Sequence, residues 1–138
     1  MPRRDQFHEL VKQALIRSGW TITDDPLYLN IGNVNIQIDL AAEPLIAATK
    51  ENQKIAVEIK SFISASKITD FYNSLGQYLT YRVALTLQEP DRELYLAVPN
   101  ITYESLFQEI LIQKVLEFYP IKIIVYNKVT QEIQLWID

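Results

Sequence analysis

Three charged residues, in two short stretches of the chain, are of types that could do chemistry together. Glu58 and Lys60 lie in residues 55–61, where apolar and polar residues alternate. Asp39 lies in a second alternating stretch, residues 34–40. Because alternation with a period of two predicts a strand with one buried face, Glu58 and Lys60 should project from one side, about 6–7 Å apart. If the two strands are neighbours, Asp39 joins them on that face.

This set of side chains suits metal-assisted hydrolysis of a phosphodiester. Carboxylate oxygens are ligands that Mg²⁺ prefers, and the ion keeps several waters. We therefore expect Asp39 and Glu58, with the backbone carbonyl of Ile59, to bind Mg²⁺ or Mn²⁺. The ion would lower the pKa of a bound water and neutralise charge on the phosphate. Lys60 could orient or help to deprotonate that water and stabilise the transition state.

The alternative interpretation is that Glu58 and Lys60 are ordinary solvated charges, since Glu-x-Lys is a common short pattern. The context favours a site, because a long helix is predicted to follow and charges that point at a covering helix lie in a cleft. Gln77 and Tyr81 on that helix are one turn apart and so can face the same strands. A tyrosine in the core and a glutamine at its rim is an equal alternative.

Composition excludes several other kinds of site. The chain has no cysteine and one histidine, His8. Zinc–thiolate sites, cysteine nucleophiles and multi-histidine metal sites are therefore excluded. A net charge of −4 and a pI near 5.0 do not suggest non-specific binding to nucleic acid. This acidity favours a second hypothesis beside metal-assisted hydrolysis, namely that the protein is a non-catalytic regulator or adaptor.

The element pattern predicts one α/β (α+β) domain over residues 1–138, with a central mixed sheet flanked by helices. No apolar run approaches the roughly 18 residues of a membrane span, so we expect a cytoplasmic protein with no membrane contact. The predicted helices span residues 5–18, 67–87 and 102–119. The predicted strands span residues 27–31, 34–40, 45–49, 54–60, 94–98, 121–126 and 132–137, with an extended piece at 20–23 and turns at 24–26 and 32–33.

The helix predicted over residues 67–87 carries two stripes. Helical spacing assigns the buried stripe to apolar residues, namely Ile68, Phe71, Tyr72, Leu75, Leu79 and Val83. The second stripe follows the spacing i, i+4, i+7 and i+11, and consists of Asp70, Ser74, Gln77 and Tyr81. Of this second stripe, Gln77 and Tyr81 are the two residues that can face the charged residues.

The charged residues resemble the motif of the PD-(D/E)xK nuclease superfamily, with Asp39, Glu58-Ile59-Lys60 and Gln77-x-x-x-Tyr81 in order. Ile38 stands where the superfamily motif has proline. More closely, the chain resembles the XisH family, the fdxN element excision controlling factors of cyanobacteria. The stretches that carry this match are Met1-Pro2-Arg3-Arg4-Asp5, Phe7-His8, Gly19-Trp20-Thr21-Ile22-Thr23-Asp24-Asp25-Pro26, Ile38-Asp39-Leu40, Ile55-Ala56-Val57-Glu58-Ile59-Lys60-Ser61-Phe62, Gln113-Lys114-Val115, Ile124-Val125-Tyr126 and Trp136-Ile137.

The superfamily resemblance implies a restriction-endonuclease-like three-layer fold and a role for each site residue. It implies metal binding by Asp39 and Glu58 and places Lys60 at the attacking water. Gln77 and Tyr81 would support the site or contact substrate.

Many superfamily members add an acidic residue from the first helix. Here the candidate is Glu9, with His8 beside it, and helical phase does not choose between them.

The XisH resemblance implies a cellular role in the developmental excision of a DNA element, as in heterocysts. It implies a site-specific recombinase and a small partner protein, XisI, as partners. DNA is then the expected substrate. Since one small domain reaches one strand of a duplex, cutting both strands predicts a homodimer or a heteromeric partner.

Overall fold

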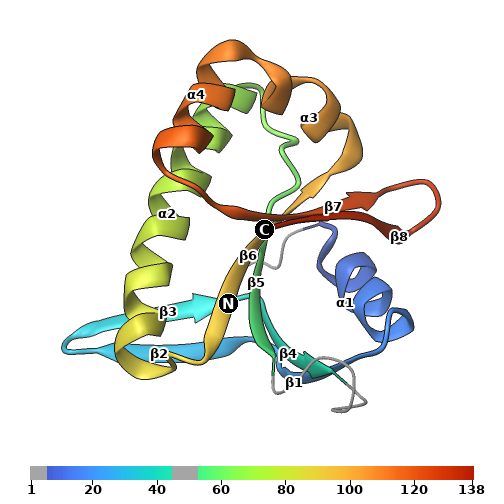
Figure 1. Ribbon diagram of the computed structural model, residues 1–138. Helices are drawn as coiled ribbons and strands as arrows, with labels where there is room; N and C mark the ends of the chain where they lie inside the picture. Colours follow the sequence, from blue (N-terminus) through green and yellow to red (C-terminus); the bar gives the residue numbers. More distant parts are fainter. Residues whose placement is uncertain (1–5, 45–52) are drawn as a thin grey trace.

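The computed structural model describes residues 6–44 and 53–138, which form three layers (Figure 1). In chain order the elements are α1 (His8–Arg17), β1 (Trp20–Asp24), β2 (Leu27–Ile31), β3 (Val34–Ile38), β4 (Leu40–Pro44), β5 (Lys54–Ile59), α2 (Lys67–Gln88), β6 (Arg92–Pro99), α3 (Asn100–Glu104), the 3₁₀ turn η1 (Leu106–Gln108), α4 (Ile110–Phe118), β7 (Lys122–Asn127) and β8 (Glu132–Ile137). The strand predicted at residues 45–49 lies outside the described residues.

The central layer is a mixed sheet of six strands in the order β1-β4-β5-β6-β7-β8. The β5–β6 and β6–β7 pairs are parallel, and the other three pairs are antiparallel. A separate hairpin pairs β2 with β3, and Ile31 lies opposite Val34 across a tight turn. Gly32 permits this turn because its φ of +60° is in the left-handed region. The predicted central mixed sheet flanked by helices is confirmed.

Each face of the sheet is covered by different helices. Helix α1 packs on one face, where Ile55, Val57 and Ile59 join Val11 and Leu15 in one buried cluster. Helices α2 and α4, with the β2–β3 hairpin, cover the other face, as Figure 1 shows. There Ala56 packs in the same cluster as Phe71 of α2. The alternation predicted for β5 is therefore confirmed, and Glu58 follows Ala56 on the α2 side.

The single strand predicted over residues 34–40 is wrong, because the chain breaks it at Asp39. Strand β3 ends at Ile38 and β4 begins at Leu40. Ile38 packs in the cluster under α2, whereas Leu40 packs in the cluster under α1. The chain thus leaves the hairpin and enters the main sheet at this residue, which places Asp39 at a junction between two sheets.

The buried face of α2 agrees in part with the predicted stripe, since Ile68, Phe71, Leu75 and Leu79 pack in or against the core. Tyr72 and Val83 were expected inside, but they are 58% and 61% exposed. The buried residues of α2 are Phe71, Ser74, Tyr78, Ala84 and Leu85. Polar side chains can lie on this face because the protein satisfies their hydrogen bonds. The Ser74 hydroxyl donates to the Asp70 carbonyl (2.7 Å), and the Tyr78 hydroxyl donates to the Leu94 carbonyl (2.7 Å).

The long helix predicted over residues 102–119 is also wrong, since the segment consists of α3, η1 and α4. The helix breaks at Ser105 and again at Glu109, whose backbone is extended. The break turns Phe107 fully into the core, where its ring meets those of Phe62 and Phe71 edge to face. Among the described helices, none is both long and apolar enough to span a membrane.

Candidate functional site

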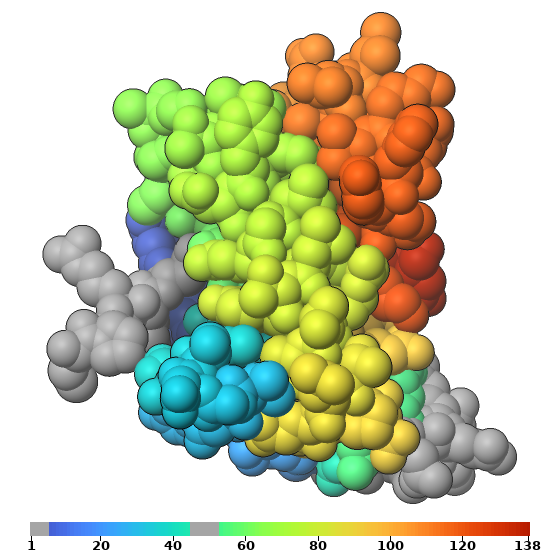
Figure 2. All heavy atoms as spheres, turned by 90° about the vertical axis from the view of Figure 1, so that its left-hand side faces the viewer, coloured from blue at the N-terminus to red at the C-terminus, as the bar shows by residue number. Residues whose placement is uncertain are grey.

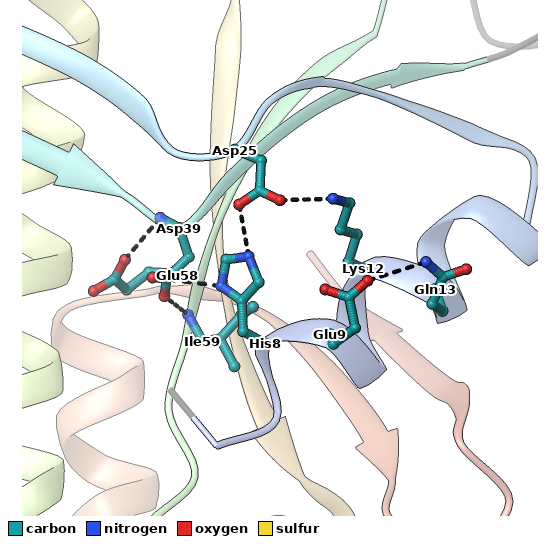
Figure 3. Close-up of polar contacts among 8 residues, drawn as sticks. All are labelled: His8, Glu9, Lys12, Gln13, Asp25, Asp39, Glu58 and Ile59. Atoms are coloured by element: carbon teal, nitrogen blue, oxygen red, sulfur yellow. Dashed lines mark hydrogen bonds and ion pairs between the residues drawn. The ribbon is translucent and has the colours of Figure 1, made fainter. Parts of the chain in front are cut away.

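Two hydrogen bonds join Asp39 to Glu58 and to the next residue, Ile59 (Figure 3). The Asp39 backbone N–H donates to Oε1 of Glu58 (3.3 Å), and the Ile59 N–H donates to Oδ2 of Asp39 (2.8 Å). The register explains the contact, because Leu40 lies opposite Val57 in the β4–β5 pair. Because β3 ends at Ile38 and β4 begins at Leu40, the Asp39 carboxylate can turn to the Ile59 N–H of β5. The predicted meeting of Asp39 and Glu58 therefore occurs, at the sheet junction.

Glu58 is a buried acid beside a second acid. Its side chain is 7% exposed. Burial is the main cause that raises its pKa, to about 9, and the charge of Asp39 raises it further. Lys60 opposes this shift with its positive charge, and it does not cancel the shift. In the protein without a bound cation, Glu58 is therefore a protonated acid at neutral pH that shares a hydrogen bond with Asp39.

Lys60 directly follows β5, and hydrogen bonds to residues of β6 and β7 fix its backbone. Its N–H donates to the Ala97 carbonyl (3.0 Å), and its carbonyl accepts from the Tyr126 hydroxyl (3.1 Å). Lys60 lines a pocket of about 220 Å³ that extends to Asp70 and Asn73 of α2. Phe62 in the pocket wall has a φ of +54°, a strained value for a bulky residue. Its buried ring, packed on Phe107, holds the segment after Lys60 in that conformation.

Helix α2 brings Tyr81 near the acidic pair. Burial raises the pKa of Tyr81, and the charges of Glu58 and Asp39 raise it further, so its hydroxyl lies within electrostatic reach of both acids. Gln77 lies one helical turn earlier. Its Oε1 is buried and has no hydrogen-bond partner within the part of the chain that the structure describes. Tyr81 also packs against the core cluster under α2, as the alternative interpretation expects, and the supporting roles of Gln77 and Tyr81 remain predictions.

The first helix brings His8 to the site and points Glu9 elsewhere. The His8 side chain is 4% exposed, and its Nδ1 lies 4.0 Å from Oδ1 of Asp39. Glu9 is exposed and accepts a hydrogen bond from Nε2 of Gln13 (3.2 Å) on the outer face of α1. Figure 3 shows His8 joined to Asp25 and Asp39, and Glu9 joined to Gln13. Of the two residues that the sequence left open, His8 is the one that contacts Asp39.

Asp25 and Lys12 extend the site behind His8, and the sequence did not reveal this. The Oδ1 atom of Asp25 lies 2.7 Å from Nε2 of His8, and its Oδ2 accepts from Nζ of Lys12 (2.7 Å). Partial burial raises the pKa of Asp25, but the hydrogen bonds and charges of Lys12 and His8 lower it more, so its net pKa lies below the usual range. Asp25 therefore remains an ionised acceptor.

A divalent cation is compatible with the donors present. Within residues 6–44 and 53–138, no group of three His, Cys, Asp or Glu side chains is arranged as a ready metal site. Two carboxylates nevertheless suffice for Mg²⁺, which keeps several waters. Two adjacent acids, one of them buried, form a pair of oxygen donors whose charge a cation would neutralise. Asp39 and Glu58 are the residues that would hold it; the role of the Ile59 carbonyl remains a prediction.

Comparison with known proteins shows similarity over almost the whole chain. The family model described as XisH protein matches residues 1–134. The crystal structure of an XisH family protein from Nostoc punctiforme is similar, with 41% sequence identity and a TM-score of 0.88 over 97% of this chain and 100% of that chain. The crystal structure of a fdxN element excision controlling factor protein from Anabaena variabilis has 46% identity and a TM-score of 0.88 over 98% and 100%. No curated protein matches the chain.

Proposed function

The chain belongs to the XisH family, and from this premise we propose that it is a metal-dependent DNA endonuclease of the PD-(D/E)xK type. It would act in the excision of a DNA element, since a similar protein is described as a fdxN element excision controlling factor. The observation that carries the proposal is the Asp39–Glu58 pair. A buried acid whose pKa is raised by burial and by a second acid is typical of a functional site.

The proposed chemistry assigns one task to each part of the site. Asp39 and Glu58 bind Mg²⁺ or Mn²⁺, which supplies Lewis-acid stabilisation of charge on the scissile phosphate. Lys60, fixed through its backbone by Ala97 and Tyr126, orients the attacking water. The pocket beside Lys60 is open along the first turns of α2 and would receive the phosphodiester. Gln77 and Tyr81 support the acids from α2.

The test is cleavage of supercoiled, branched and single-stranded DNA in the presence of Mn²⁺. We expect the unaltered protein to nick at least one of these substrates and Lys60→Ala to abolish nicking. Lys67→Ala, which removes an exposed lysine at the start of α2, is the matched control and should cut normally. The experiment is repeated with the XisI-type partner that the family suggests. Cleavage that survives Lys60→Ala would refute the assignment.

Metal binding is measured separately by calorimetry with Mn²⁺. We expect Glu58→Ala to remove the binding, because it leaves Asp39 as the one carboxylate of the pair. Glu132→Ala, which removes an exposed glutamate on β8, should bind Mn²⁺ like the unaltered protein. An unaltered protein that binds no Mn²⁺ would favour the second function below.

The second candidate function is a non-catalytic regulator that binds an XisI-type protein or a site-specific recombinase. An apolar groove of about 340 Å³ between the β2–β3 hairpin and the C-terminal half of α2 favours it, together with the net charge of −4. Figure 2 shows the hairpin (cyan) against this end of α2 (yellow). Val34, Val83 and Leu87 are more than half exposed there. Loss of partner binding in Val83→Asp, with unchanged folding, would support this function.

A further inference from the structure

We infer that Asp25 and His8 form a positioning pair that orients a water molecule against Asp39. The inference rests on the proposed hydrolytic function, and it assigns a purpose to three residues that the proposal does not use: His8, Lys12 and Asp25. The three side chains form a continuous chain of contacts from α1 and the turn after β1 into the acidic pair (Figure 3).

The first step is the position of the imidazole proton. An ionised carboxylate only accepts hydrogen bonds. Both oxygens of Asp25 are engaged, one by the Lys12 ammonium and the other by Nε2 of His8, each at 2.7 Å. Nε2 must therefore be the donor. In a neutral imidazole only one nitrogen carries the proton, so Nδ1 presents a lone pair.

The second step is what that lone pair faces. Nδ1 lies 4.0 Å from Oδ1 of Asp39, too far for a direct hydrogen bond. It is buried and has no hydrogen-bond partner among the described residues. Nδ1 of His8 and Oδ1 of Asp39 are both acceptors, and their separation allows one molecule that donates two protons to lie between them. A water about 2.8 Å from each atom spans about 4.0 Å when the angle at its oxygen is about 90°.

The third step is what this placement does. Such a water donates both protons to His8 and Asp39, so its oxygen lone pairs point away from these two residues. It lies beside the carboxylate that we propose as a cation ligand, where an attacking water is needed. Asp25 acts through His8 and is a positioning residue, and Lys12 fixes which oxygen of Asp25 the imidazole meets.

The pair can be tested through the tautomer of His8, because the chain has one histidine and its imidazole ¹⁵N signals need no further assignment. In Asp25→Asn, the amide has one oxygen, which the Lys12 ammonium will take because an ammonium only donates. The amide NH₂ then faces Nε2, which must accept, and the proton moves to Nδ1. We expect Nε2–H in the unaltered protein and Nδ1–H in Asp25→Asn.

A second variant tests the role of Lys12 in this switch. In Asp25→Asn combined with Lys12→Met, the amide oxygen is released and can turn to Nε2–H. The original tautomer should then return. Asp24→Asn is the matched control: Asp24 contacts Thr23 and Arg92, not His8, so the tautomer should not change. Nδ1–H or a doubly protonated ring in the unaltered protein, or no switch in Asp25→Asn, would overturn the inference.

The functional consequence is measured with the same variants. We expect Asp25→Asn to lower the rate of DNA nicking about tenfold to a hundredfold, the usual effect of losing an orienting partner, while Mn²⁺ binding by calorimetry is kept. The double variant should recover part of the rate. A tautomer switch with an unchanged nicking rate would overturn the positioning role. Absence of nicking in the unaltered protein would instead refute the proposed function, and the spectra would still decide the tautomer.

Discussion

At the scale of single residues, the cost of keeping Glu58 buried is the most direct test of the site. Because its pKa is raised in the folded protein, Glu58 holds its proton more tightly there than in the unfolded chain. The tighter proton binding contributes to the stability of the folded protein. This contribution is complete below pH about 4.5 and is lost as the pH rises toward about 9. A glutamine cannot lose a proton, so Glu58→Gln should not show this loss.

We therefore expect Glu58→Gln to be more stable than the unaltered protein at pH 8, by about 1–3 kcal/mol, and nearly equal to it at pH 4.5. The measurement is urea denaturation across this pH range with a chelator present. Glu132→Gln changes an exposed glutamate and should have the same pH dependence as the unaltered protein. A Glu58→Gln difference that does not grow with pH would show that Glu58 titrates normally.

The sequence predicted on which side of β5 Glu58 lies because strand alternation is local, whereas Asp39 joins it from the junction between β3 and β4 and not from a strand. Each strand needs only its own apolar residues to fix which side chains point where. The role of Asp25 could not be predicted in the same way. Its contact with His8 joins residues 17 positions apart, through the turn after β1. An Asp-Asp-Pro pattern predicts that turn, and the turn is present, but no local pattern states which helix it packs on.

At the scale of elements, Tyr78 ties α2 to two strands of the sheet. Its hydroxyl donates to the Leu94 carbonyl of β6 (2.7 Å) and accepts from the Lys122 N–H of β7 (3.0 Å). The residue is 1% exposed, so these bonds are made in a largely buried place. Tyr78→Phe should lower the free energy of unfolding by about 1–3 kcal/mol, because it leaves both backbone groups without this partner.

The matched control for Tyr78→Phe is Tyr72→Phe on the same helix. Tyr72 is 58% exposed, and we expect a change of less than about 0.5 kcal/mol. Urea denaturation followed by circular dichroism measures both variants. Equal losses in the two would mean that the Tyr78 hydroxyl does not anchor the helix.

The stripe predicted for α2 was right at Ile68, Phe71, Leu75 and Leu79, which pack in or against the core, and wrong at Tyr72 and Val83. A pattern based on apolar residues assigns Val83 to the inside and takes no account of a hydroxyl that can be satisfied there. Tyr78 and Ser74 occupy the buried face because backbone carbonyls accept from them. The break within the helix predicted over residues 102–119 was missed for a related reason. The predicted helix is apolar over much of its circumference, so the periodicity of its residues does not mark where Phe107 turns inward.

At the scale of the whole molecule, the family and the layered architecture were predicted, and the switch of the chain between sheets was not. The family resemblance is confirmed. The alternating stretch of residues 34–40 gave no sign that its two ends belong to different sheets, because Ile38 and Leu40 are both apolar and both buried. Only the packing of Ile38 under α2 and of Leu40 under α1 separates them. That switch is the feature that brings Asp39 to the site.

The two buried clusters share the central strands and should therefore unfold together. Strand β6 contributes Tyr95 and Ala97 to the cluster under α1, and Leu94 and Leu96 to the cluster under α2. Loosening either face removes packing from the same backbone, so we expect one cooperative transition, as in most small single domains.

Two spectroscopic signals report separately on the two faces of the sheet. Trp20 and Trp136 stack at 5.6 Å in the cluster under α1, so tryptophan fluorescence reports on that face. Circular dichroism reports mainly on helix, of which α2, on the other face, is the longest described element. The urea midpoints from the two signals should coincide. A fluorescence midpoint at lower urea would mean that the α1 layer, which carries His8, separates first and that the site is lost before the rest of the fold.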